Sequence, residues 1–169
     1  MPKAIKTYVK WVDAVNRVIG NFSMYIVLAM TGILVFETIS RNIFSRPHIW
    51  VVEIIEFMMA AYYLLGGGYS VILKGHVRMD ILYGRWSPKG QAIADLLTAP
   101  FFIFYVVFLL IGGLSGLQYA LQYGQKNYTS WGPPMAPIKF IMVVGILLML
   151  MQAIATFFKD LAKLKGEEL

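Results

Sequence analysis

The sequence predicts an all-α integral membrane protein with four transmembrane helices. Of its 169 residues, 59% are hydrophobic and only 14% are charged, whereas a soluble domain carries about 25% charged residues. The mean hydropathy is +0.66, and the apolar residues come in long runs. A helix needs about 20 mostly apolar residues to cross the hydrocarbon core of a bilayer. Four runs in this chain reach that length, and a soluble fold of this size would need far more polar surface.

The four predicted spans cover residues 18–43, 50–73, 93–117 and 137–158. Trp50, Trp86 and Trp131 lie at or just outside the ends of spans, where tryptophan is enriched at the membrane–water interface. The first apolar run is too long for a cleaved signal peptide, and no A-x-A site follows it. No repeat, low-complexity tract or linker divides the chain, so we expect a single membrane domain over residues 1–169.

Residues 1–17 show the pattern of an amphipathic helix. Ile5, Val9 and Val12 recur at helical spacing, and basic residues lie between them. This pattern predicts a helix that lies in the cytoplasmic interface of the membrane and runs into the first span. A plain cytoplasmic extension of that span is the alternative.

The distribution of Lys and Arg predicts the orientation of the spans. The N-terminal tail, the second loop and the C-terminal tail lie on one side of the membrane and carry eleven basic residues, against four on the other side. Cytoplasmic segments carry the excess of basic residues. We therefore expect both termini in the cytoplasm. The eleven are Lys3, Lys6, Lys10, Arg17, Lys74, Arg78, Arg85, Lys89, Lys159, Lys163 and Lys165, and the four are Arg41, Arg46, Lys126 and Lys139.

Charged residues inside the first two spans predict a cluster at their outer ends. Arg41 follows Glu37 by one helical turn, a favourable spacing for an ion pair. The hairpin has its middle near Pro47, and Arg41 and Glu53 lie six residues to either side, so they should face each other at similar depth. We expect a cross-hairpin ion-pair cluster that fixes the packing of the two spans. A transported-ion or proton site and a contact with a partner protein are the alternatives. The cluster would comprise Glu37, Arg41 and Glu53, with Arg46 or Glu56.

A second polar group follows the second span, in the stretch LKGHVRMDIL. We expect it to be a structural cytoplasmic turn in which Asp80 pairs with Arg78 or Arg85. One His and one Asp are too few ligands for a metal site, and a proton relay would need these groups inside the membrane. The predicted turn consists of His76, Arg78, Asp80 and Arg85.

Two patches of small residues lie late in the second and third spans, in the stretches LLGGGYS and GGLSG. Such patches let helices approach closely, and they would serve internal packing or a partner helix. Gln152 is the one strongly polar residue of the last span, for which we expect a local hydrogen bond.

The composition also excludes several classes of function. The chain has no cysteine, which excludes disulfides, thiolate metal sites and cysteine nucleophiles. The net charge is +6, but the basic residues form no continuous patch for nucleic acid, and phospholipid headgroups fit them better. His48 and His76 lie at opposite edges of the spans, where they do not suit a haem. We expect no catalytic residue, no metal and no cofactor, and so no enzyme.

The order of these features resembles a known family. A four-span chain has RNIFSRPHIWVVEIIEF between its first two spans, GHVRMDILYGRWSP after the second, and a proline-containing loop before the fourth. This pattern resembles the small membrane subunit of tripartite ATP-independent periplasmic (TRAP) transporters, the DctQ-like family, over nearly the whole chain. The most specific positions are Arg41, Trp50, Glu53 and the string His76 to Asp80, in which Met79 replaces the more common Val or Ile.

The resemblance implies a role that composition does not. In that family the small subunit binds a large multispan subunit, which holds the substrate and coupling-sodium sites and moves by an elevator-like mechanism. The small subunit enlarges the static scaffold in the bacterial or archaeal inner membrane. A periplasmic binding protein captures an organic acid, often a dicarboxylate or a sialic acid, and docks on the outer face. Candidate docking residues here are Arg46, Trp50, Tyr123, Lys126, Tyr128 and Trp131.

Two other functions compete with this one. A homodimeric small proton-coupled multidrug exporter also has four spans, and Glu37 would be its proton carrier. This chain is long for that class, and Glu37 lies off-centre beside Arg41, whereas an exporter needs an unpaired glutamate. An anchor subunit of a redox enzyme is the third hypothesis, and the positions of both histidines argue against it.

Overall fold

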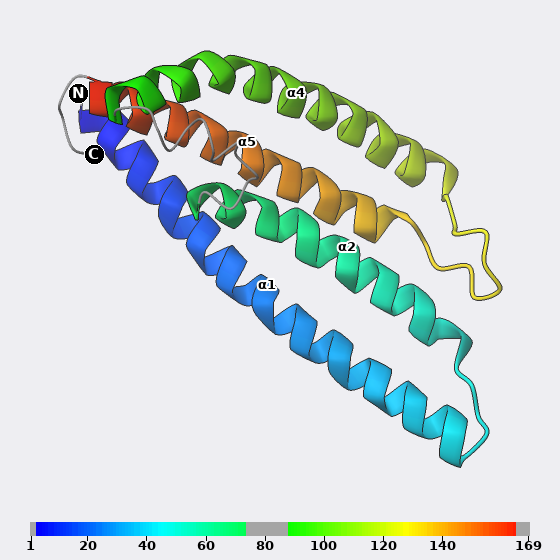
Figure 1. The fold of residues 1–169 in the computed structure, drawn as a ribbon. Coiled ribbons are helices and arrows are strands. Elements are labelled where there is room, and N and C mark those ends of the chain that lie inside the picture. Colours follow the sequence, from blue (N-terminus) through cyan, green and yellow to red (C-terminus); the bar gives the residue numbers. More distant parts are fainter. Residues whose placement is uncertain (1–2, 74–87, 165–169) are drawn as a thin grey trace.

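The computed structural model describes residues 3–73 and 88–164, which form four long helices (Figure 1). They are α1 (Lys3–Ile43), α2 (Ile49–Ile72), α4 (Pro88–Tyr123) and α5 (Ala136–Leu164). Each is long and apolar enough to cross a membrane. The prediction of four membrane-spanning helices is thus confirmed at the level of helix length and composition. The predicted turn with His76, Arg78, Asp80 and Arg85 lies outside the described residues.

The helices lie side by side in the order α4, α5, α2, α1 and form an open layer (Figure 1). Helix α5 is the centre of this layer, since it packs against each of the other three. In its most apolar stretch 39% of the residues are buried, compared with 11% in α1 and in α4. Most of the apolar surface of α1 and α4 therefore faces outward.

Both hairpins lie at one end of the layer. The connection from α1 to α2 and the connection from α4 to α5 are at the same end, which we call the hairpin end (Figure 1). The beginning of α1, the beginning of α4 and the end of α5 lie at the opposite end, which we call the terminal end. Helices α1, α4 and α5 thus run from one end of the molecule to the other, and the shorter α2 ends before it reaches the terminal end.

The N-terminal residues are the first turns of α1 and not a separate helix. Helix α1 continues without a break for 41 residues, about 60 Å at 1.5 Å per residue. Its apolar stripe packs against α5 beyond the end of the shorter α2, where Val9, Val12 and Ala155 are buried together. The Tyr8 hydroxyl donates a hydrogen bond to the Met151 carbonyl oxygen at 3.1 Å. The apolar stripe of these first turns therefore has a protein partner in α5.

A buried polar network joins α1 to α5 near the terminal end. Asn16 Nδ2 donates to Gln152 Oε1 at 3.0 Å, and Gln152 Nε2 donates to Asp13 Oδ1 at 2.9 Å. Lys159 Nζ closes the network on both oxygens of Asp13, at 2.7 and 2.6 Å. Asn16 and Gln152 are almost completely buried. The local bond expected for Gln152 was wrong, because its partners are on a helix more than a hundred residues away in the chain.

Glycines allow α2 to approach both neighbouring helices. A Cβ atom on Gly68 would collide with the side-chain amide of Asn16 on α1. A Cβ atom on Gly145 of α5 would come within 2.6 Å of the Leu64 carbonyl oxygen on α2. By contrast, Gly66 and Gly112 have open space where their Cβ atoms would be. The small-residue patches therefore contribute to internal packing at some positions and face outward at others.

We predict that Gln152→Leu lowers the stability of the isolated subunit in detergent by about 1–2 kcal/mol, because it removes two interhelical hydrogen bonds. The measurement is the midpoint of thermal unfolding. Gln118→Leu makes the same change at an exposed position of α4 and should leave the midpoint unchanged. Equal midpoints for both variants would show that the network does not hold α1 to α5.

We also predict that Gly145→Ala destabilises the isolated subunit by about 1–3 kcal/mol, because the added methyl group overpacks the contact with the α2 backbone. Gly112→Ala is the matched control, and it should be neutral or slightly stabilising, since alanine favours a helix over glycine. Thermal unfolding in the same detergent compares the two. A stable Gly145→Ala protein would contradict the close contact between α2 and α5.

Candidate functional site

The carboxylate of Glu37 closes the α1–α2 hairpin. Its Oε1 accepts the backbone N–H of His48 at 3.2 Å and Nη2 of Arg41 at 3.3 Å. Its Oε2 lies 3.0 Å from Nδ1 of the His48 ring. Glu37 is buried, with 8% of its surface exposed. One carboxylate therefore joins the last turn of α1 to the residue that precedes α2.

Ser40 supports the same hairpin through the backbone. Its hydroxyl donates to the Arg46 carbonyl oxygen at 3.0 Å, and its carbonyl oxygen accepts the N–H of Arg46 at 3.2 Å. Ser45 adopts a left-handed backbone conformation with φ of 51°, which turns the chain back toward α2. His48 then precedes the first turn of α2, and its carbonyl oxygen accepts the N–H of Val51 at 3.3 Å.

His48 is the functional residue of the hairpin that sequence reasoning missed. Its ring lies 5.4 Å from the ring of Phe36 and 5.8 Å from that of Trp50, measured between centroids. Together with the bonds to Glu37, these contacts hold the histidine between the two helices. The sequence signal that could have indicated this role is the position of His48. It lies just before a predicted helix, in a short loop that follows a glutamate within the first span.

The predicted ion pair between Arg41 and Glu53 does not form. Arg41 binds Glu37, and Glu53 is buried with 4% exposure. Within the described residues, Oε2 of Glu53 has no hydrogen-bond partner. Arg41 and Glu53 lie equally far along the chain from Pro47, but their side chains do not pair. Glu53 lies roughly 200° around α2 from Val51, at about 100° per residue, and on nearly the same face as Leu64, which packs against α5.

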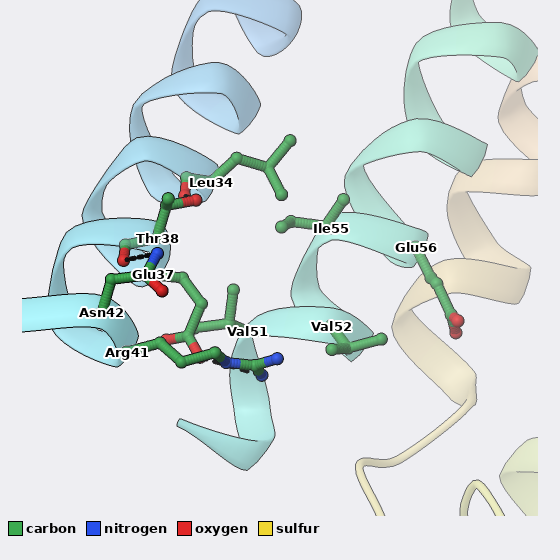
Figure 2. A pocket seen from close by; sticks show the side chains of 9 residues that line it. All are labelled: Leu34, Glu37, Thr38, Arg41, Asn42, Val51, Val52, Ile55 and Glu56. Carbon is green, nitrogen blue, oxygen red and sulfur yellow. Dashed lines mark hydrogen bonds and ion pairs between the residues drawn. The ribbon is translucent and has the colours of Figure 1, made fainter. Parts of the chain in front are cut away.

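The residues near Glu37 also line a hollow between α1 and α2 (Figure 2). We call it the α1–α2 hollow, and its volume is about 360 Å³. Figure 2 shows the Arg41 guanidinium extending from α1 toward Val52, while Glu56 projects from the far side of α2. Glu56 is exposed and is not part of the ion pair at the hairpin. The lining residues are Leu34, Glu37, Thr38, Arg41, Asn42, Val51, Val52, Ile55 and Glu56.

The connection between α4 and α5 forms a compact loop. The N–H of Asn127 donates to the Pro133 carbonyl oxygen, and that of Met135 to the Gln125 carbonyl oxygen, both at 2.9 Å. Lys139 Nζ, in the first turns of α5, donates to the Gln125 side chain at 2.6 Å and to the Gly116 carbonyl oxygen at 3.2 Å. These bonds tie the loop to the ends of both helices.

The candidate docking residues are divided between the two hairpins. Arg46 and Trp50 belong to the α1–α2 hairpin, and the other four belong to the end of α4 and the α4–α5 loop. Tyr128 is fully exposed, and Tyr123 and Trp131 are also exposed. Trp131 additionally lines an apolar groove of about 500 Å³ with Phe57 and Pro133. Both groups lie at the hairpin end (Figure 1).

Metal binding has no support in the described part of the chain. Within residues 3–73 and 88–164, no three His, Asp or Glu side chains lie close enough together to hold a metal ion. The Glu37 carboxylate is instead occupied by donors from Arg41 and His48.

We predict that Glu37→Ala lowers the thermal unfolding midpoint of the isolated subunit by several degrees and makes residues 44–48 sensitive to protease. The substitution leaves the His48 N–H and the Arg41 guanidinium without their acceptor. Glu56→Ala removes an exposed carboxylate from the same part of the molecule and should leave both measurements unchanged. Equal protease resistance of both variants would contradict the role of Glu37 in closing the hairpin.

A comparison with protein families identifies this architecture. The family described as "Tripartite ATP-independent periplasmic transporters, DctQ component" matches residues 30–163. The matched region begins within α1 and reaches the end of α5, so it includes the Glu37 hairpin and the α4–α5 loop. No curated protein matches the chain.

The resemblance seen in the sequence is confirmed, and the hypotheses of a multidrug exporter and an enzyme subunit are set aside. This chain belongs to the DctQ family and is a multi-pass small membrane component of a TRAP transporter, not an enzyme.

Proposed function

We propose that the chain is the static scaffold and membrane anchor of a TRAP transporter for an organic acid of the dicarboxylate or sialic acid class. It would bind the large multispan subunit, which holds the substrate and the coupling sodium. It would also help to dock the periplasmic substrate-binding protein. In this proposal the chain itself binds no cofactor and no nucleic acid, and phospholipids surround the rest of its surface.

The open layer of helices is the observation that carries this proposal. A path for a solute needs polar groups that face a space enclosed by several helices. Here α4 packs chiefly against α5, and α1 packs against α2 over its second half. Most buried polar groups of the described residues bond to other parts of the same chain. Gln152 bonds to a neighbouring helix, and Glu37 and Ser40 bond to the α1–α2 connection. Such a layer presents wide apolar surfaces to a membrane partner and to lipid.

The orientation in the membrane follows from two supporting observations. The terminal end holds the beginnings of α1 and α4 and the end of α5 (Figure 1). In the sequence, eleven of the fifteen Lys and Arg residues lie in the two terminal segments and the loop after the second span. We therefore propose that the terminal end is cytoplasmic in a bacterial or archaeal inner membrane. The hairpin end, with Arg46, Lys126 and Tyr128, would then face the periplasm and the binding protein.

The first test is purification of the affinity-tagged chain from its native membrane in a mild detergent, followed by mass spectrometry. We expect one large multispan partner in stoichiometric amount, because the open layer leaves α1 and α4 mostly uncovered. Recovery of a homo-oligomer alone would contradict the scaffold function.

We predict that the pair of changes Arg46→Glu and Lys126→Glu reduces uptake driven by the binding protein at least several-fold in proteoliposomes. Opposite charge at a rim mainly slows association, so higher concentrations of binding protein should restore part of the rate. Lys10→Glu reverses an exposed charge at the terminal end and serves as the control. Co-purification of the large subunit should be the same for all three proteins. A loss of uptake in the control alone would reverse the proposed orientation.

A further inference from the structure

Glu56 is a charged residue in an unfavourable place for contact with lipid. Helix α2 has 24 residues, so it is about 36 Å long, slightly more than the hydrocarbon core of about 30 Å. Glu56 lies seven residues after Ile49, or about 10 Å from the beginning of the helix. With α2 centred in the bilayer, the carboxylate lies inside the hydrocarbon core, and its side chain is exposed on the helix surface. An ionisable group at this depth is costly unless another group pairs with it.

Arg41 adds unused hydrogen-bond donors to the same hollow. Its side chain is 60% exposed, and its bond to Glu37 engages Nη2 alone. A guanidinium carries five N–H donors, so most of them remain open toward the α1–α2 hollow (Figure 2). Since Glu37 and Arg41 neutralise each other, Glu56 leaves one net negative charge at this surface.

The rest of this surface is apolar and exposed. Leu34 and Val52 line the hollow and are 45% and 55% exposed. The outward face of α4 differs, because its exposed side chains Phe101, Phe104 and Phe108 are aromatic and bring no charge. Acyl chains suit the α4 face. The α1–α2 hollow has an apolar wall and the open guanidinium donors of Arg41. At its α2 edge stands Glu56, whose carboxylate projects away from Arg41 and forms no ion pair with the described residues. Acyl chains cannot satisfy these polar groups.

We infer that the α1–α2 hollow is the contact site for a membrane-spanning helix of the other membrane component of the transporter. That helix carries a basic side chain opposite Glu56 and a hydrogen-bond acceptor within reach of Arg41. The inference rests on the proposed scaffold function and goes further, because it selects one face of the layer and states the chemistry of the partner. A phospholipid phosphate is disfavoured as the occupant, since it would meet the net negative charge.

The absence of cysteine allows a direct test by site-specific crosslinking. Val52→Cys places a thiol at the hollow, and Phe104→Cys places one on the outward face of α4. Both are labelled with a benzophenone maleimide in native membranes and irradiated, and the products are identified by mass spectrometry. We expect a crosslink from position 52 to the large membrane subunit, and lipid adducts from position 104.

Charge variants supply the second measurement. Glu56→Lys should reduce co-purification of the large subunit at least ten-fold, and Glu56→Gln should reduce it less, because the amide keeps an acceptor for the basic partner. Purified without the large subunit, both Glu56 variants should unfold at the same temperature as the wild-type chain. Reduced co-purification then reports loss of the contact and not loss of the fold.

The possible outcomes distinguish this inference from the proposed function. Lipid adducts alone at position 52, in membranes where the large subunit still co-purifies, would overturn the inference and leave the scaffold function intact. A crosslink from position 52 to a second copy of this chain would also overturn it. Failure of the wild-type chain to co-purify with any large subunit would contradict the scaffold function itself.

Discussion

The hydrophobic effect contributes little to the association of helices in a bilayer, because lipid tails are as apolar as the side chains they replace. Close van der Waals packing and interhelical hydrogen bonds drive the association instead. The arrangement of this protein therefore depends on its few buried polar groups and on close contacts at glycine. The network of Asp13, Asn16, Gln152 and Lys159 joins α1 to α5. Gly145 lets the backbones of α5 and α2 meet. Helix α5 thereby becomes the centre on which the other helices pack.

The hairpin end shows how three acidic residues in neighbouring helical turns acquire different environments. Glu37 is buried and receives donors from His48 and Arg41. Glu53 is buried on another face of α2, and Oε2 of its carboxylate has no partner among the described residues. Glu56 is exposed beside the α1–α2 hollow. The first bonds to both sides of the turn between α1 and α2, and the third forms no ion pair with the described residues.

This division of roles suits a component that works only in an assembly. A subunit of a TRAP transporter must hold its own shape and also leave surfaces for its partners. The bonds of Glu37 and Ser40 and the ties of Lys139 keep the two hairpins compact. The outward faces of α1 and α4 remain uncovered. Under the proposed scaffold function, an open layer would enlarge the static part of the transporter, and its wide contact with lipid would resist movement.

The sequence by itself determined that the described residues contain four helices apolar enough to span a bilayer, because each span requires about 20 apolar residues. The helices of the structure extend beyond three of the four predicted spans, most of all α1, which begins at Lys3 and not near residue 18. The direction of each side chain was decided only by the tertiary structure. A shift of one residue turns a side chain by about 100° without changing the hydropathy of the span, and so Glu53 is buried apart from Arg41 while Arg41 binds Glu37. The sequence also did not determine the partners of Gln152 or the contact of the first turns of α1 with α5. These contacts join segments far apart in the chain, and only the packing of the helices brings them together.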